Sequence, residues 1–302
     1  MKILLLGRNG QVGWELQRSL APLGEVLALD RHSTVACGDL SQPEALVQTV
    51  LNFQPQLIVN AAAHTAVDKA ESEPELARLL NATAPGALAQ AAKTVGAWLV
   101  HYSTDYVFNG QGQTPWREDD ATAPLNVYGQ TKLEGERLIA ASGCQHLIFR
   151  TSWVYASRGG NFAKTMLRLA QERDKLTVID DQFGAPTGAD LIADVTAHAI
   201  RQVSGANAQA ALSGIYHLVA AGQTTWHGYA QHVIETAQRL APEKNWPVQE
   251  IAPVPSSAFV TAARRPHNSR LDTHKLQTTW GLQLPDWQSG VDRMLAETVS
   301  FA

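Results

Sequence analysis

The stretch Gly7-Arg8-Asn9-Gly10-Gln11-Val12-Gly13 decides the fold, because it lies between an apolar run at residues 3–6 and a helical pattern at residues 11–20. Glycines let the backbone turn tightly and approach a diphosphate without a Cβ in the way. A helix that begins directly afterwards offers free N–H groups and a partial positive charge. We therefore predict a strand, a dinucleotide-binding turn and a helix, whereas the alternative is an ordinary glycine-rich turn. The residues expected at the cofactor are Gly7, Gly10, Gln11, Val12 and Gly13.

Composition narrows the class of protein. The chain has 302 residues, 45% of them hydrophobic and 17% charged, with a formal net charge of −4. That length predicts one large lobe or two unequal lobes, and the acidic balance speaks against a nucleic-acid partner. No apolar run approaches the ~20 residues of a membrane span, so we expect no membrane insertion. Two cysteines, Cys37 and Cys144, cannot build a disulfide framework, and the cytoplasm is the expected compartment.

Short apolar runs alternate with helical patterns through the first half of the chain. Strands are predicted at residues 3–6, 26–29, 57–60, 98–103 and 147–151, with a further short strand just before Asp39. Helices are predicted at residues 11–20, 43–53, 74–95 and 125–141, with Ser41 as the N-cap of the second. This alternation is typical of βαβ units and a parallel sheet that is covered on both faces. The predicted fold class is therefore α/β, a doubly wound parallel sheet of the Rossmann type.

The second half of the chain has a looser alternation of strands and helices, with more tryptophan and more loop signals. Helices are predicted at residues 162–172, 190–203, 227–240 and 287–299, and a surface loop at residues 205–213. We expect residues 1–155 to form an NAD(P)-binding domain and residues 156–302 to form a smaller substrate domain. A strand near residues 215–219 is expected to return to the main sheet, so the two domains are interleaved.

Acidic and small residues extend the predicted cofactor site. Asp30 ends the second strand about 20 residues after the glycines, where a carboxylate binds ribose hydroxyls, although a turn aspartate fits the same position. Arg8 and Arg31 lie beside it and can offset its repulsion of the extra phosphate of NADP, so we expect either NADPH or NADH. Asp39 and Leu40 are expected to flank the adenine. Ala62 and Ala63 follow the strand predicted at residues 57–60. Their small side chains permit close approach of a cofactor, although tight packing of a helix is an alternative reason for them.

The pair Tyr128 and Lys132 opens a predicted helix. Residues i and i+4 share one helix face, so the lysine ammonium is expected near the phenol. A neighbouring cation lowers the pKa of a tyrosine from about 10 toward the range that acid–base catalysis needs. Upstream, Thr104 and Asp105 end another strand, and parallel sheets place ligands at that edge. The alternatives are a bland surface pair at the helix and a strand-end cap at Thr104 and Asp105.

At these residues the sequence resembles the extended short-chain dehydrogenase/reductase superfamily. The segments that carry the resemblance are GRNGQVG (residues 7–13), NAAAHTAVDKAE (60–71), YSTDYVF (102–108), PLNVYGQTK (124–132), RTSWVY (150–155), DQFGAPT (181–187) and RPHNSRL (265–271). Within the superfamily, the similarity is strongest to the branch that reduces a 4-keto sugar nucleotide. The related dehydratases have the triplet T-D-E where this chain has Thr104-Asp105-Tyr106, which favours reduction over elimination.

The resemblance implies an NAD(P)H-dependent oxidoreductase. Its reaction would be reduction of the C4 ketone of dTDP-6-deoxy-L-lyxo-4-hexulose to dTDP-L-rhamnose, the last step in making a sugar that usually enters surface polysaccharide. Tyr128 would protonate the alkoxide, Lys132 would hold the nicotinamide ribose and lower the phenol pKa, and Thr104 would orient the ketone. The resemblance also adds Thr65 and Tyr102 to the cofactor site.

The expected substrate is a small-molecule nucleotide sugar. The resemblance places Trp153 in the sugar site, where indole offers a flat surface, and Asp105 and Val67 are expected beside it. Arg265 is expected to grip the nucleotide diphosphate, since its planar fork suits phosphate, although a surface arginine fits equally. Residues 109–124, rich in glycine, proline and acidic residues, are expected to form a loop that edges the substrate pocket.

Family members are often homodimers, and some carry Mg²⁺ at the dimer contact. A homodimer is therefore expected here, and Glu15, Asp190 and Asp292 are acidic residues that could contribute to a metal site, although scattered carboxylates are more often solvated.

Two other functions are compatible with these residues. One is a non-catalytic nucleotide-binding regulatory subunit, and the other is a sugar-nucleotide epimerase that retains its NAD.

Overall fold

A wholly parallel sheet of six strands forms the centre of the fold in the computed structural model, which describes residues 1–204 and 210–299. Its strands are β1 (Lys2–Leu6), β2 (Glu25–Leu29), β3 (Leu57–Asn60), β4 (Trp98–Thr104), β5 (His146–Thr151) and β10 (Gly214–His217). They lie in the order β10-β5-β4-β3-β1-β2. The order reverses direction beside β1, as in doubly wound folds, so the predicted fold class is confirmed.

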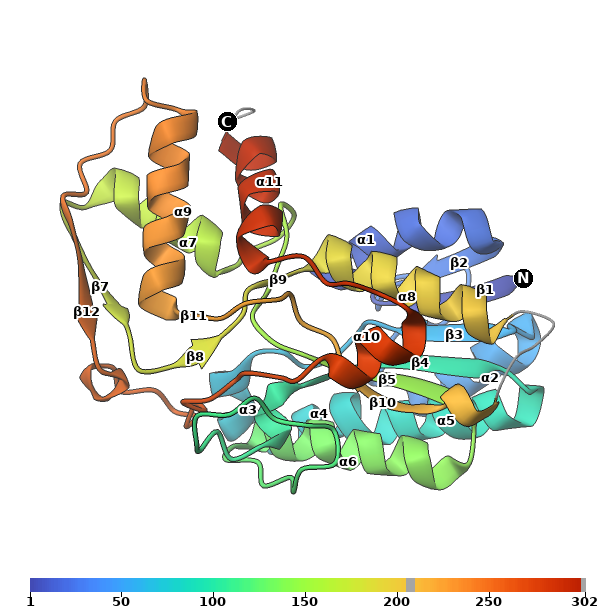
Figure 1. Cartoon of the computed structure of the whole chain (residues 1–302). Helices are drawn as coiled ribbons and strands as arrows, with labels where there is room; N and C mark the ends of the chain where they lie inside the picture. Colours follow the sequence, from blue (N-terminus) through green and yellow to red (C-terminus); the bar gives the residue numbers. More distant parts are fainter. Residues whose placement is uncertain (205–209, 300–302) are drawn as a thin grey trace.

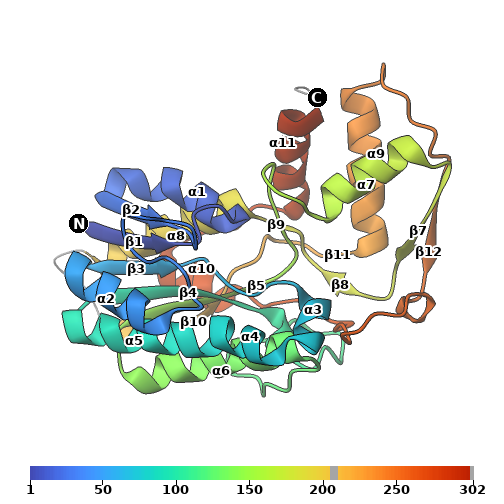
Figure 2. The same cartoon turned by 180° about the vertical axis from the view of Figure 1, so that it is seen from behind.

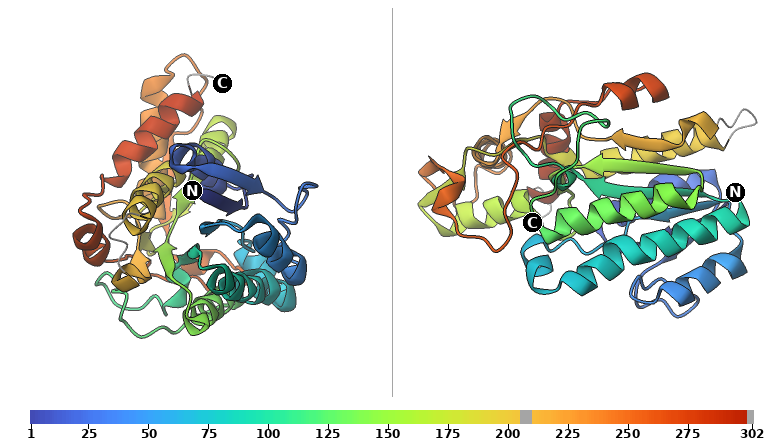
Figure 3. Two further views of the ribbon diagram at one scale, coloured as in Figure 1. Left: turned by 90° about the vertical axis from the view of Figure 1, so that its right-hand side faces the viewer. Right: turned by 90° about the horizontal axis from the view of Figure 1, so that it is seen from below.

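Helices cover both faces of this sheet (Figure 1). On one face lie α1 (Gln11–Leu20), α8 (Ala189–Val203) and α10 (His274–Trp280), whose buried side chains share one core with Ile3 and Leu5 of β1. On the other face lie α2 (Pro43–Phe53), α5 (Ala84–Val95) and α6 (Val127–Ser142), whose buried side chains share a second core with Leu4 and Leu6. Successive residues of a strand point to opposite faces, which explains why the run at β1 is apolar without interruption. Figure 3 shows α5 and α6 side by side beneath the sheet.

A smaller lobe with its own core stands beyond the carboxyl ends of the strands (Figure 2). It consists of α7 (Phe162–Glu172), α9 (Trp226–Leu240) and α11 (Trp287–Val299), with the parallel pair β7 (Lys175–Ile179) and β12 (Glu250–Val254). Two short pairs connect the lobes: β6 (Val154–Tyr155) with β9 (Thr187–Gly188), and β8 (Phe183–Gly184) with β11 (Thr224–Thr225). The chain leaves the sheet after β5 and returns to it for α8, β10 and α10, and β10 pairs with β5.

Two local predictions before α2 are wrong. The strand predicted directly before Asp39 is absent from the described residues, because residues 30–42 form a loop that passes close to the end of β2 at Gly38. A Cβ on Gly38 would lie 2.6 Å from the Asp30 carbonyl oxygen, so this close approach requires glycine. Ser41 is not the N-cap of α2 either. Pro43 occupies the first helical position, so the cap is Gln42, and the Ser41 N–H is bound by Asp39.

Several elements were absent from the sequence prediction. They are α3 (Val67–Ser72), α10, and short 3₁₀ turns that include Asp105–Val107, Ala210–Leu212 and Ser256–Ala258. The helix predicted at residues 74–95 is present as α4 (Pro74–Arg78), a π turn (Leu79–Thr83) and α5. The loop predicted at residues 205–213 lies partly outside the described residues. Of the helices in the described ranges, none is both long and apolar enough to cross a bilayer.

Candidate active site

A cleft of about 850 Å³ opens at the carboxyl ends of the central strands. Its walls bring together nearly all of the predicted cofactor residues: Gly7, Gly10, Gln11, Val12, Asp30, Asp39, Leu40, Ala62, Ala63, Thr65, Tyr102, Tyr128 and Lys132. The predicted substrate residues Thr104, Asp105, Trp153 and Val67 line the same cleft. Gly13 lies behind the loop, and Arg265 lines a second cavity. Residues from segments far apart in sequence thus form one continuous site.

The glycine loop leaves space and unpaired donors for an anionic group. Gly7 has φ of 87°, and a Cβ there would come within 2.7 Å of the Ala62 nitrogen. A Cβ on Gly13 would lie 2.0 Å from the Gly7 carbonyl oxygen, so both positions require glycine. No side chain caps α1, whose N-cap is Gly10, and its first turn carries no acidic residue. This loop therefore fits the diphosphate of a dinucleotide.

Asp30 is fixed at the far end of the same groove. Its carboxylate accepts hydrogen bonds from the His32 N–H at 2.8 Å and from Arg8 Nε at 3.0 Å, and also from the Asn9 amide. The His32 N–H and the Arg8 guanidinium hold the pKa of Asp30 below its ordinary value, despite opposing burial. Of the two arginines predicted here, Arg8 pairs with the carboxylate, while Arg31 contacts the His32 ring. A charged carboxylate with an adjacent guanidinium suits an adenosine ribose.

The helix α6 carries Tyr128 and Lys132 in its first two turns. Asn126 caps it, accepting a hydrogen bond from the Gly129 N–H at 2.8 Å. Gly129 allows the helix to lie close to the 3₁₀ turn that follows β4, since a Cβ there would meet the Tyr106 carbonyl oxygen at 2.2 Å. The capped and closely packed helix start fixes where the two side chains emerge.

Lys132 binds the strand β4, which the sequence did not predict. Its Nζ donates to the Tyr102 carbonyl oxygen at 2.5 Å and lies 3.1 Å from His101 Nε2. Burial lowers the pKa of Lys132 to about 8, against the opposing charge of Glu136. The amine thus makes its hydrogen bonds to the main chain and to an imidazole, rather than to the phenol of Tyr128.

The predicted fall in the pKa of Tyr128 is wrong for this structure. Burial raises the pKa of Tyr128 to about 12, and the hydroxyl of Thr104 opposes that shift. The physical reason is that desolvation penalises a phenolate, and the nearest cation is directed to β4. Tyr128 therefore keeps its proton at neutral pH.

Thr104 and Asp105 lie at the end of β4, beside Tyr128. Thr104 Oγ1 donates to Asp105 Oδ1 at 3.1 Å and accepts from the Tyr106 N–H at 3.2 Å. Burial raises the pKa of Asp105 to about 7, although hydrogen bonds from Ser269 and Thr104 oppose the shift. Among the described residues, four buried oxygens at this edge have no hydrogen-bond partner: Ser103 Oγ, Asp105 Oδ2, Thr151 Oγ1 and Ser152 Oγ. Unsatisfied buried oxygens that line a cleft suit a polyhydroxylated ligand.

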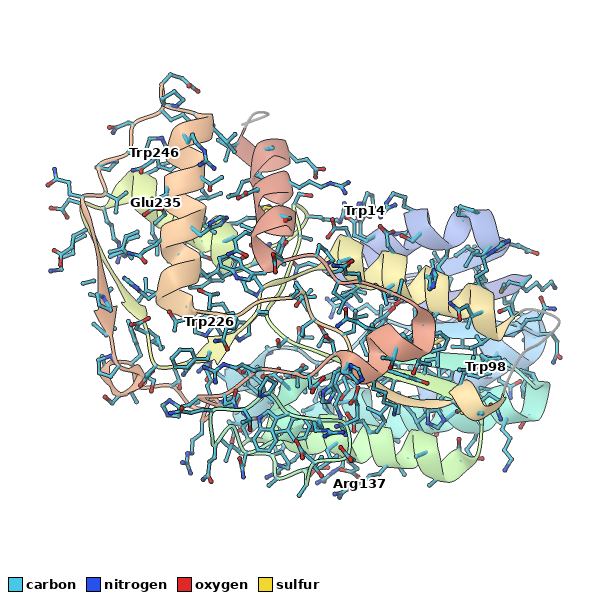
Figure 4. The ribbon with its side chains drawn as sticks, viewed as in Figure 1. Trp14, Trp98, Arg137, Trp226, Glu235 and Trp246 are labelled. Carbon is cyan, nitrogen blue, oxygen red and sulfur yellow. The ribbon has the colours of Figure 1, made fainter. Side chains whose placement is uncertain are left out.

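Trp153 forms the opposite wall with a residue that the sequence analysis did not identify. Its backbone has a positive φ of 49°, which is unusual for a bulky residue. Its ring stacks on Trp226 with centroids 3.7 Å apart, and Trp226 Nε1 donates to Gln182 Oε1 at 3.2 Å. Figure 4 shows Trp226 at the end of α9 nearest the sheet. No local motif marks Trp226, because it enters the site only when the small lobe packs on the sheet.

The RmlD substrate binding domain family matches residues 1–300. A dTDP-4-dehydrorhamnose reductase of Shigella flexneri is 62% identical over 297 residues, which are 98% of each chain, and one of Escherichia coli (strain K12) is 61% identical over the same share. The chain belongs to the dTDP-4-dehydrorhamnose reductase family. The crystal structure of the Bacillus anthracis reductase in complex with NADP is 34% identical, with a TM-score of 0.88, and the match covers 98% of this chain and 99% of that one.

A second cavity of about 1000 Å³ adjoins the first in this member of the family. Tyr106 and Trp226 line both cavities. Its walls are mainly apolar side chains of the small lobe, with cationic residues at one side: Phe162, Met166, Leu176, Val178, Phe259, Arg264 and Arg265. Arg265 is paired with Asp68, with Nη2 and Oδ2 in hydrogen-bond contact at 2.6 Å. The arginine is therefore held at the cavity by α3.

The loop predicted at residues 109–124 is a loop in the structure. Trp116 exchanges backbone hydrogen bonds with the segment beyond the small lobe, donating to the Arg270 carbonyl and accepting from the Asp272 N–H. Asn109 and the three residues after it line the second cavity. The loop thus edges the pocket, and its hydrogen bonds attach it to the segment that carries Arg265.

The acidic residues considered for Mg²⁺ do not gather. In residues 1–204 and 210–299, no group of three or more histidine, cysteine, aspartate or glutamate side chains could hold a metal ion. Glu15 lies 3.6 Å from Arg18, Asp292 binds His232 at 2.7 Å, and Asp190 lies 3.9 Å from Arg293. Each carboxylate therefore has a basic side chain beside it and none shares a site with another, so this fold gives no support for Mg²⁺.

Proposed function

We propose that this protein is a dTDP-4-dehydrorhamnose reductase. It would reduce the C4 ketone of dTDP-6-deoxy-L-lyxo-4-hexulose with NAD(P)H and release dTDP-L-rhamnose, completing dTDP-rhamnose synthesis. The observation that carries this proposal is identity above 60% to reductases along 98% of both chains. Thr104, Tyr128 and Lys132 in one cleft supply the acid–base chemistry that such a reduction needs.

The nicotinamide cofactor, when bound, supplies the hydride. The uncapped start of α1, with Gly10, Gln11 and Val12, would hold its diphosphate, and Asp30 would hold the adenosine ribose. Ala62 and Ala63 leave room beside the glycine loop because neither has a side chain beyond Cβ. The remaining predicted cofactor residues, Asp39, Leu40, Thr65 and Tyr102, complete the walls of this half of the cleft.

Tyr128 is the proton donor in this proposal. Reduction of a ketone leaves an alkoxide, which takes the phenolic proton of Tyr128 and becomes the 4-hydroxyl. A pKa of about 12 means that the phenol is protonated at neutral pH and ready to donate. The Thr104 hydroxyl, close enough to oppose that shift, would orient the ketone oxygen toward the phenol. Lys132 would hold the nicotinamide ribose, and its charge would stabilise the phenolate that remains after transfer.

The two cavities suit the two halves of a nucleotide sugar. The sugar would lie between Asp105 and Trp153, with Val67 beside it, where buried oxygens lack partners. The nucleotide would enter the second cavity, whose apolar walls accept a base and whose Arg265 accepts a diphosphate. Trp226, shared by both cavities, would mark the boundary between the two halves.

Both NADPH and NADH are proposed to serve as cofactor. Asp30 alone would repel the extra phosphate of NADPH, but Arg8 lies 3.0 Å from its carboxylate and compensates that charge.

We also propose a homodimer, since Trp14, 44% exposed on α1, carries the guanidinium of Arg158 over its ring and offers an apolar contact. The cytoplasm is proposed because Cys37 and Cys144 are free thiols.

The test mixes the purified chain with NADPH and the 4-keto sugar nucleotide and follows the loss of NADPH absorbance. The expected result is stoichiometric oxidation of NADPH with formation of dTDP-L-rhamnose. Folded protein that binds NADPH without turnover would favour the regulatory subunit instead. Co-purification of NAD with no net consumption would favour the epimerase.

A further inference from the structure

His101 lies beneath the catalytic residues, and none of the functions assigned above uses it. It is 1% exposed on β4, between Asn60 of β3 and Lys132 of α6. Its two ring nitrogens both have polar neighbours: Nδ1 lies 3.2 Å from Asn60 Nδ2, and Nε2 lies 3.1 Å from Lys132 Nζ. Because both neighbours can donate hydrogen bonds, the position of the imidazole proton decides which of the two ring nitrogens accepts one.

The backbone fixes which way Asn60 faces. The Ala62 N–H donates to Asn60 Oδ1 at 3.2 Å, so turning the amide over would place two donors against each other. Asn60 Nδ2 therefore donates to His101 Nδ1. A neutral imidazole carries one proton, which must then lie on Nε2, facing Lys132. Burial, followed by the charge of Lys132, holds the pKa of His101 well below its ordinary value, so the ring is neutral.

This arrangement has a consequence for the lysine. When His101 carries its proton on Nε2, that N–H donates to Lys132 Nζ, which can accept only if the amine is neutral. The same amine donates to the Tyr102 carbonyl oxygen. An ammonium at Lys132 needs the other tautomer, with its proton on Nδ1. That tautomer in turn requires Asn60 to rotate and release the Ala62 N–H. The charge of Lys132 is thereby connected to the loop that lines the predicted cofactor groove.

Other charged groups near Lys132 come from two elements. Glu136 lies one turn further along α6 and favours the ammonium, but it is engaged in a buried pair with Arg150 of β5, at 2.7 Å. Tyr128 on α6 is protonated, and Asn60 on β3 carries no charge. His101 on β4 is the titratable group that directly contacts the amine.

We propose that His101 is a positioning residue for Lys132, which with Asn60 sets the hydrogen-bonding state of the lysine amine and links it to the loop at residues 61–65. The role of Lys132 as a catalytic residue rests on the proposed reductase function. The hydrogen-bond linkage itself does not, and it can be measured in the free protein without substrate.

The first measurement is the tautomer of His101. Protein labelled with ¹⁵N in its histidine rings is examined by two-bond ¹H–¹⁵N correlation, and His101→Gln assigns the signal among the 10 histidines. The expected result at pH 9.5, where Lys132 with its pKa of about 8 is neutral, is a neutral ring protonated on Nε2. In Asn60→Asp, whose carboxylate accepts from both Ala62 N–H and His101, the proton should move to Nδ1. A charged ring, an Nδ1 proton in the unaltered protein, or no change in the variant would overturn the proposal.

The second measurement is NADPH binding as a function of pH, followed by nicotinamide fluorescence. Asn60→Asp leaves Nε2 free to accept from an ammonium, so the alkaline midpoint of NADPH binding should rise by about one pH unit, a tenfold gain in proton affinity. The double variant Asn60→Asp with His101→Gln is the matched control and should lose most of that rise. An equal rise in both variants, or none in either, would show that His101 has only a structural role. NADPH binding with the expected shift but no reduction of the sugar nucleotide would reject the reductase and leave this linkage standing.

Discussion

Trp153 and Trp226 stack face to face, with ring centroids 3.7 Å apart and planes inclined by 17°, where the main lobe meets the small lobe. Trp153 follows β5, whereas Trp226 begins α9. Since Trp226 also lines the second cavity, the stack separates the proposed sugar site from the proposed nucleotide site. Its geometry therefore depends on how the two lobes sit against each other.

Trp226→Ala should raise the KM for the sugar nucleotide with a smaller effect on kcat. The variant removes an indole that lines both cavities and leaves Trp153 without its stacking partner, so an increase of about 2–10-fold is expected. Steady-state kinetics with each substrate varied in turn measures it. Trp246→Ala, which removes a tryptophan from the small-lobe core outside both cavities, is the control for general loosening and should leave that KM unchanged. An increase in the KM for NADPH alone would contradict the placement of the stack.

Tyr128→Phe should lower turnover by about 10²–10⁴-fold, the usual contribution of a positioned acid. The phenyl ring keeps the contact with Tyr106, whose centroid lies 5.6 Å away, so the cleft should keep its shape. The NADPH dissociation constant, measured by fluorescence, is therefore expected to change little. Normal turnover in this variant would remove Tyr128 from its role as proton donor.

Lys132→Met should stabilise the free protein while impairing catalysis. Burial lowers the pKa of Lys132 from 10.5 to about 8, so the folded state binds the proton more weakly than the unfolded chain. The cost of burying the charge is complete below pH 8 and fades as the pH rises toward 10.5. It amounts to at most about 3 kcal/mol. Urea unfolding at pH 7 and pH 10 checks this, since the gain should be larger at pH 7. A loss of stability at both values would contradict it.

Asp105→Asn should raise the free energy of unfolding at high pH but not at low pH, the opposite of the pH dependence expected for Lys132→Met. Burial raises the pKa of Asp105 from 3.8 to about 7, so the buried carboxyl group favours the folded state fully below pH 3.8. That contribution is lost as the pH rises through 7, where the carboxylate must ionise without solvent. The variant should therefore be more stable than the parent at pH 8, on the order of 1–3 kcal/mol, and equal to it at pH 4. Thermal unfolding across this range measures the difference.

Arg8→Ala should weaken NADPH binding more than NADH binding. Without the guanidinium 3.0 Å away, the Asp30 carboxylate repels an additional phosphate without compensation. The ratio of kcat/KM values for the two cofactors should shift several-fold toward NADH. Arg31→Ala provides the comparison, because Arg31 contacts His32 and not the carboxylate. An equal loss with both cofactors would assign Arg8 to general structure.

The sequence predicted those parts of the site that local chemistry determines. The glycine loop, the capped start of α6 and the polar end of β4 each carry their structural reason within a few residues. The carboxyl ends of parallel strands bring them to one edge without further information. That is why Gly7, Thr104 and Tyr128 line one cleft as expected.

What the sequence could not predict depends on contacts between distant elements. The direction of the Lys132 side chain is set by the Tyr102 carbonyl oxygen of β4. Every residue has a backbone carbonyl, so the sequence cannot indicate which one a lysine will bind. The pKa of Tyr128 depends on how deeply it is buried, which helical spacing does not reveal. Trp226 reaches the site from the small lobe, more than 70 positions after Trp153 in the chain. Each case is a property of packing and not of a motif.

The return of the chain to the sheet after its excursion into the small lobe bears on how the protein is made. α8 covers one face of the sheet, and β10 pairs with β5 at one edge, yet both follow α7 and β7 in the chain. At least the first 217 residues must therefore have left the ribosome before β10 can pair with β5. Until then, Leu147 and Phe149 lack their final cover. Nascent chains stalled near residue 155 should accordingly depend on chaperones more heavily than chains stalled beyond β10.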